Sequence, residues 1–145
     1  MHKKWVGVST GLLIIIGFVF SGDPISAQRT KGKTRLAQTK YLMKGIAQPA
    51  TGGLAASLKE TGPADDKAWE TAVGQASVLN ELSYLLMDDG RCPDAVWAGA
   101  SQDLRAGSAQ LAEALEKKDL EAARAAFKTT TASCATCHKA HKNKT

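Results

Sequence analysis

The sequence predicts an all-α fold, an antiparallel up-down-up-down four-helix bundle, for this chain of 145 residues. Aromatic residues make up only 6% of the chain, alanine is abundant, and no run shows sustained apolar/polar alternation. Apolar residues recur instead every three or four positions, as on one side of a helix. Short connections separate the helical stretches, which favours neighbours that run in opposite directions.

Residues 1–27 have the pattern of a secretory signal peptide. His2, Lys3 and Lys4 form a positively charged region, an apolar run spans residues 6–20, and Ala27 supplies the small residue at a cleavage site before Gln28. The apolar run has about 15 residues, fewer than the ~20 needed to span a bilayer, which favours cleavage over an uncleaved membrane anchor. We therefore expect an exported, periplasmic protein whose single domain is residues 28–145 and which has no stable membrane anchor.

The net charge of +5 is moderate for this length. Removal of the signal peptide takes away two lysines and one aspartate, which leaves a formal charge of +4. The basic residues are not interleaved with aromatic side chains, so the pattern does not indicate nucleic-acid binding.

A first helix is expected over about residues 34–47, with Thr34 as its N-cap, after a disordered basic leader at residues 28–33. Pro49 and the pair Gly52-Gly53 should bend or break the chain, so residues 54–58 either continue this helix or form a second piece. The expected apolar side of the helix carries Leu36, Leu42, Met43, Ile46 and Ala47.

Three further helices are expected after this point. Asp65 or Asp66 should cap the second, and Asp94 the third. Trp69, Trp97 and Phe127 fall at helical spacing and are assigned to core packing. The expected bounds are Lys67–Met87, Ala95–Lys117 and Leu120–His141.

The fourth helix contains Cys134-Ala135-Thr136-Cys137-His138, a Cys-x-x-Cys-His motif typical of c-type haem attachment. Two thiols at this spacing can add to the two vinyl groups of one porphyrin, and His138 can then ligate the iron as the proximal ligand. Covalent attachment takes place outside the cytoplasm, which agrees with the predicted export. The sequence thus predicts one haem c, covalently bound near the C-terminal end of the fourth helix.

Two alternatives use the same residues. A zinc site would have to take Cys134, Cys137, His138 and His141, which all fall within eight residues, whereas Cys2His2 sites separate their ligand pairs by ~12 residues or more. A redox dithiol is expected at the junction of a strand and a helix, and no strand pattern lies nearby.

The second axial ligand must come from upstream, because only seven residues follow His138 and none is methionine. His141 lies one turn beyond His138 on the same helix and cannot reach the distal side, so we expect it to be exposed. Met43, on the apolar side of the first helix, is the preferred distal ligand. Met87 is read as a packing residue, and an iron without a distal protein ligand stays an alternative.

At these residues the sequence resembles the class II cytochromes c, meaning cytochrome c′ and cytochrome c556. The resemblance rests on the motif at the end of a fourth helix, through Cys134, Cys137 and His138, with Met43 provisionally on the first. It implies that a methionine on the first helix gives a six-coordinate electron carrier like cytochrome c556. A bulky residue that does not ligate gives a five-coordinate cytochrome c′ that binds NO or CO. The arginine that the family often places one turn before the distal residue is Thr39 here, with Arg35 a further turn back.

The expected function is therefore electron transfer by a haem with His and Met ligands, with binding of NO or CO as the alternative. No second cluster of titratable residues indicates an enzyme. Redox proteins are the expected partners, and Lys139, Lys142 and Lys144 near the motif could steer acidic ones.

Cys92 is left over once the haem has taken two thiols. It lies in the turn Gly90-Arg91-Cys92-Pro93, which we expect to be exposed. A disulfide-linked homodimer and a free thiol are the two alternatives, and the free thiol is preferred because no partner cysteine is visible.

Overall fold

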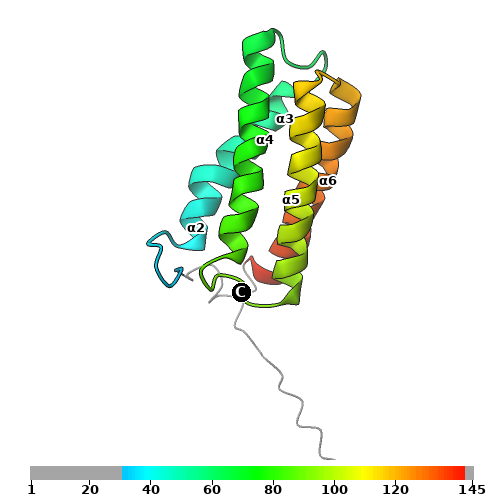
Figure 1. Ribbon diagram of the computed structural model, residues 1–145. Helices are drawn as coiled ribbons and strands as arrows, with labels where there is room; N and C mark the ends of the chain where they lie inside the picture. Colours follow the sequence, from blue (N-terminus) through cyan, green and yellow to red (C-terminus); the bar gives the residue numbers. More distant parts are fainter. Residues whose placement is uncertain (1–30, 143–145) are drawn as a thin grey trace, which may run out of the picture.

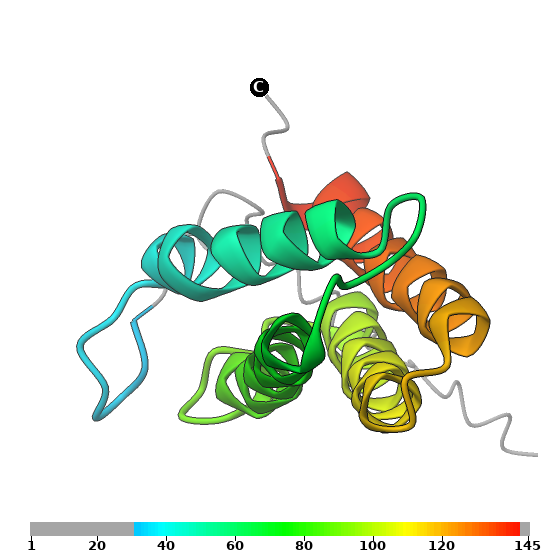
Figure 2. The same ribbon diagram turned by 90° about the horizontal axis from the view of Figure 1, so that it is seen from above.

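The computed structural model describes residues 31–142, and in this part the regular secondary structure is helical, with one isolated β-bridge between Lys31 and Gln38. This confirms the all-α class, and the arrangement of the described helices is consistent with a four-helix bundle (Figures 1 and 2). The predicted signal peptide lies outside the described residues. None of the described helices is long and apolar enough to cross a membrane. The elements are α2 (Thr39–Leu42), η1 (Met43–Ala47), α3 (Gln48–Ser57), α4 (Asp66–Met87), α5 (Ala95–Glu116) and α6 (Leu120–His141).

Helices α4, α5 and α6 begin and end within one residue of the predicted bounds. An aspartate precedes each of them, and its carboxylate accepts a hydrogen bond from a backbone N–H in the first turn, which satisfies a donor that has no partner within the helix. The N-cap residues are Asp65, Asp94 and Asp119, with oxygen to nitrogen distances of 2.8, 2.9 and 3.0 Å.

Helix α5 lies between α4 and α6 and packs extensively on both (Figure 2). Close approach to α6 depends on Gly107, where an added Cβ would lie 2.8 Å from Oγ1 of Thr130. Of the three expected core aromatics, Trp97 is buried, and Trp69 and Phe127 are partly buried against the core. The leucines that are almost fully shielded from solvent are Leu54, Leu79, Leu82, Leu111 and Leu115.

The first helix begins at Thr39 instead of the predicted Thr34. It continues past Pro49 and the glycine pair to Ser57, as α2, η1 and α3 in succession, which is one of the two alternatives that the sequence left open. A proline has no N–H to donate, and its ring clashes with the carbonyl four residues earlier in a regular α-helix. The wider π-helical turn of Met43–Ala47 ends two residues before Pro49 and accommodates it. Burial of Leu54 then holds the glycine-containing part against the bundle.

Thr34 is not an N-cap, because its N–H and hydroxyl both donate to the carboxylate of Asp89 in the turn between α4 and α5. The N–H of Arg35 donates to the same carboxylate, and that of Lys33 to the carbonyl oxygen of Asp89. Residues 31–33, expected to be disordered, are therefore held at this turn. Leu36, expected on the apolar side of the helix, precedes the helix and is 87% exposed.

The same turn contains a buried cation. Arg91 is 2% exposed, and its Nη1 donates to the carbonyl oxygen of Ala37 over 2.7 Å. Asp89 and Gly90 both have positive φ angles, of 58° and 77°, a conformation that glycine tolerates best and aspartate better than most residues. The turn thus fixes the start of the first helix through contacts between residues more than 50 positions apart.

Replacing Asp89 with asparagine should lower the melting temperature at pH 7 by a few degrees. Burial by itself would raise the pKa of the Asp89 carboxyl, but hydrogen bonds from Arg35 and Thr34 and the charge of Arg91 hold it below its usual range. A depressed pKa adds stability above the unfolded-state pKa of about 3.9, and this stability is lost as the pH falls through the folded-state value. Thermal unfolding at pH 7 and pH 3 tests this.

The difference between wild type and Asp89→Asn should therefore shrink at pH 3. The exposed Asp103 has no hydrogen bond or salt bridge to the described residues, so Asp103→Asn is the matched control. Equal effects of the two substitutions at pH 7 would contradict the role given to Asp89.

Two ends of the bundle can be distinguished. At the motif end, the end of α6 meets the start of α5 and the turn that holds residues 31–38 (lower part of Figure 1). At the far end, the loop after α3 meets the start of α6. There Nε of Arg124 donates to the carbonyl oxygen of Leu58 over 3.0 Å, and Lys118 pairs with Asp66 at 2.7 Å.

Candidate functional site

The Cys-x-x-Cys-His motif occupies the last turns of α6. Cys134 and Cys137 are three residues apart, so their thiols lie on one side of the helix. Both are half-buried and pack against the hydrophobic core, and the Sγ of Cys134 lies 3.6 Å from the carbonyl oxygen of Thr130. His138 directly follows and is exposed. The helix thus presents two free thiols beside apolar surface, with an imidazole next to them.

Burial controls the ionisation of these groups. Burial raises the pKa of the Cys134 thiol. The pKa of the Cys137 thiol is raised to about 11, first by burial and then by the nearby negative charges of Cys134 and Asp94. The pKa of His138 is lowered, first by partial desolvation and then by the positive charge of Lys142. At neutral pH the thiols are therefore protonated and the imidazole is largely neutral, the form in which it can ligate a metal.

His141 is buried, and the expectation that it is exposed was wrong. Only 6% of its surface is accessible, and its ring meets Trp97 edge to face with centroids 5.3 Å apart. Its Nε2 lies 3.4 Å from Oδ1 of Asp94. The sequence did contain a signal, because His141 continues a stripe of buried or half-buried residues spaced three or four apart along α6. That stripe is Ala123, Ala126, Thr130, Ser133, Cys137 and His141.

The described residues do not form a zinc site from these side chains. His138 faces solvent while His141 is buried against Trp97. No group of three or more cysteine, histidine or acidic residues in residues 31–142 could hold a metal ion. The redox dithiol also lacks its expected setting, because Cys134 and Cys137 lie inside a helix and not at its junction with a strand. The arrangement fits a group attached through both thiols.

Both methionines considered as distal ligands are half-buried against the same core as the thiols. Met43 begins the π-helical turn η1, and Met87 is the last residue of α4, so both lie toward the motif end. The first helix packs mainly on α4, and the structure records no bond between Met43 and the described residues of α6. Leu42 is buried and Ile46 half-buried beside Met43, whereas the exposed Leu36 is not part of this apolar surface.

Cys92 is half-buried and packs against the core, although its turn was expected to be exposed. Its Sγ lies 3.4 Å from the carbonyl oxygen of Asp94. The thiol is free, and the pairing of two chains through it stays an untested alternative.

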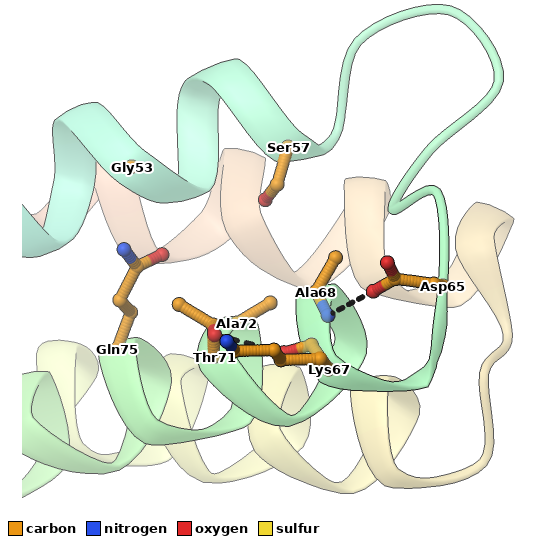
Figure 3. Close-up of a pocket in the computed structure, with 8 residues that line it drawn as sticks. All are labelled: Gly53, Ser57, Asp65, Lys67, Ala68, Thr71, Ala72 and Gln75. Carbon is orange, nitrogen blue, oxygen red and sulfur yellow. Dashed lines mark hydrogen bonds between the residues drawn. The ribbon is translucent and has the colours of Figure 1, made fainter.

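Two open clefts lie along the first helix, away from the motif. One of about 350 Å³ separates the end of α3 from the start of α4 (Figure 3). Its lining residues are Gly53, Ser57, Asp65, Lys67, Ala68, Thr71, Ala72 and Gln75. A second, of about 380 Å³, follows η1 and α3 along α4 and is mainly apolar. In the first cleft the carboxylate of Asp65 is engaged as the N-cap of α4.

Comparison with known proteins gives one match. The family model described as cytochrome c′ matches residues 93–142, which comprise α5, α6 and the whole motif. This confirms the resemblance to class II cytochromes c that the motif indicated. No curated protein and no solved structure matches the chain.

Proposed function

We propose that this c-type cytochrome, whose α5 and α6 match the cytochrome c′ family, is an exported electron carrier of the cytochrome c556 type. One haem c would be attached near the C-terminal end of the fourth helix of an antiparallel bundle. Redox proteins would be its partners, and we assign it no enzymatic reaction. The observation that carries the proposal is a Cys-x-x-Cys-His motif whose two free, half-buried thiols adjoin the core.

The residues at the end of α6 fit a haem c. Thiols one turn apart on one side of α6 can form both thioether bonds, and the core beside them offers apolar surface to the macrocycle. His138 is adjacent and exposed, and its imidazole is largely neutral, the form that can ligate iron. When bound, the haem supplies a one-electron redox couple, and this chain holds, shields and ligates it.

Met43 is proposed as the distal ligand. It shares the core with both thiols and lies toward the motif end, on a helix other than α6. A thioether from this side would stabilise the ferrous state and raise the reduction potential. It would also occupy the position that a gas molecule needs.

Binding of NO or CO at an open distal position is the second candidate function. The observation that favours it is the packing of the first helix, which contacts α4 much more than α6. Leu42 and Ile46 would then line an apolar distal pocket, and Met43 would serve only in packing.

Replacing Met43 with alanine should convert the ferric holoprotein from low spin to high spin. Loss of the thioether leaves the iron with His138 as its only protein ligand, so the ferrous variant should also bind CO. Optical spectra of both oxidation states, before and after addition of CO, measure this. Met87→Ala is the matched control, because Met87 is also half-buried against the core and should leave the spectra unchanged.

The unmodified protein should itself be low spin and insensitive to CO. A high-spin spectrum that shifts on addition of CO would instead establish the gas-binding function. A change in spin state with Met87→Ala but not with Met43→Ala would move the distal ligand to α4.

A further inference from the structure

The two ends of the bundle carry opposite charge. At the motif end, seven basic residues outnumber the three aspartates Asp88, Asp89 and Asp94, a formal excess of four positive charges. Six of the seven are exposed, and only Arg91 is buried. The exposed basic residues, called here the basic end, are Lys31, Lys33, Arg35, Lys40, Lys139 and Lys142.

The far end has the reverse balance. Eight acidic residues outnumber five basic ones there, a formal excess of three negative charges. The acidic residues are Glu60, Asp65, Asp66, Glu70, Glu113, Glu116, Asp119 and Glu121, and all are exposed. The basic residues are Lys59, Lys67, Lys117, Lys118 and Arg124.

The three aspartates at the motif end are already engaged in local contacts. Asp88 pairs with Arg35 at 3.3 Å, Asp89 accepts hydrogen bonds from the backbone of Thr34 and Arg35, and Asp94 lies beside His141. Among the described residues, no salt bridge joins a carboxylate to any of the five lysines of the basic end. The charges of these five lysines are therefore exposed to solvent and not neutralised by a carboxylate of the described residues.

Helix dipoles do not cancel this asymmetry. The motif end contains the starts of α2 and α5 and the ends of α4 and α6. Two positive and two negative helix termini offset one another, so the side chains determine the field there. The separation of charge extends along the length of the 22-residue helices, about 33 Å at 1.5 Å per residue. That is several Debye lengths at physiological ionic strength, so a partner at one end feels mainly that end.

We infer that the basic end is the docking surface for an acidic face of a redox partner protein. This inference rests on the proposed electron-transfer function and adds the chemistry and place of the partner. Attraction at the basic end and repulsion at the far end orient the approaching partner, so that it meets the end of the bundle that carries Cys134, Cys137 and His138. The surface includes residues 31–35, which the turn at Asp89 holds in place.

The first test locates an anion without any redox reaction. Hexacyanochromate(III) is an inert paramagnetic trianion that broadens the NMR signals of nearby residues. Added to the holoprotein at low ionic strength, it should broaden amide signals of residues 31–40 and 139–142 and spare those of residues 59–70 and 113–121. Broadening that is uniform, or strongest at the far end, would overturn the inference.

The second test uses charge reversals that alter net charge equally. One double variant, Lys31→Glu with Lys33→Glu, changes the basic end. The matched control is the double variant Lys59→Glu with Lys67→Glu at the far end, where both lysines are exposed and lack salt bridges to the described residues. Lys139→Glu/Lys142→Glu gives a second variant of the basic end should the first be poorly folded. The probe is hexacyanoferrate(III), which takes one electron from the ferrous protein and becomes hexacyanoferrate(II).

At low ionic strength, reversal at the basic end should slow this second-order reaction about tenfold or more, whereas the control should change it less than about twofold. Both differences should fade as salt is added. Equal slowing by the two pairs would show that only net charge matters and would overturn the inference. The spin state and the response to CO of the unmodified protein are recorded separately. Failure of the electron-carrier proposal can therefore be distinguished from failure of the docking surface.

Discussion

Replacing both Cys134 and Cys137 with serine should abolish covalent attachment of haem. A serine hydroxyl does not form the thioether bond through which the two half-buried thiols of α6 would hold the porphyrin. The variant, exported by cells competent in cytochrome c maturation, should show no haem stain on a denaturing gel, where the wild type stains strongly. Each single replacement should leave one bond, with a smaller yield and a shifted pyridine haemochrome band.

Cys92→Ser is the control for this experiment. Cys92 is also half-buried against the core, but it lies in the turn before α5 and outside the motif. It should retain the full haem content. Haem that remains covalently bound to the double variant would contradict the assignment of Cys134 and Cys137, and loss of haem in Cys92→Ser would show that the effect is one of folding.

Leu54→Ala should destabilise the protein by about 3 kcal/mol. The Leu54 side chain is completely buried where α3 packs on α4, so truncation removes apolar contact and leaves a cavity. Leu54 lies beyond Pro49 and the glycine pair, in the part of the first helix that only tertiary packing stabilises. Urea denaturation measures the change in the free energy of unfolding.

Leu36→Ala is the matched leucine truncation. Leu36 is 87% exposed, and its loss should change the free energy of unfolding by less than about 0.5 kcal/mol. The sequence alone places Leu36 on the apolar side of the helix and would therefore predict a larger loss for this substitution. Comparable effects of the two substitutions would show that residues 48–57 do not pack as described.

The sequence by itself determined what depends on neighbours along the chain. The three later helices could be predicted to within one residue because each has a run of apolar residues at helical spacing, and a capping aspartate marks the start of the first two of them. The haem motif was equally local, since its chemistry needs two cysteines and a histidine within five residues. The match of residues 93–142 to the cytochrome c′ family falls on this well-predicted part of the chain.

The tertiary structure decided what depends on residues far apart in sequence. Thr34 was read as a helix cap from its position, but its hydrogen bonds go to Asp89, 55 residues later. His141 was expected to be exposed because it lies one turn beyond His138 and cannot reach the distal side, but Trp97 of another helix covers it. Pro49 and the glycine pair left open whether the helix continues, and a π-helical turn and the burial of Leu54 keep it continuous. In each case contacts between distant segments outweighed the local preference, because a turn or a helix end takes the conformation that satisfies its buried groups.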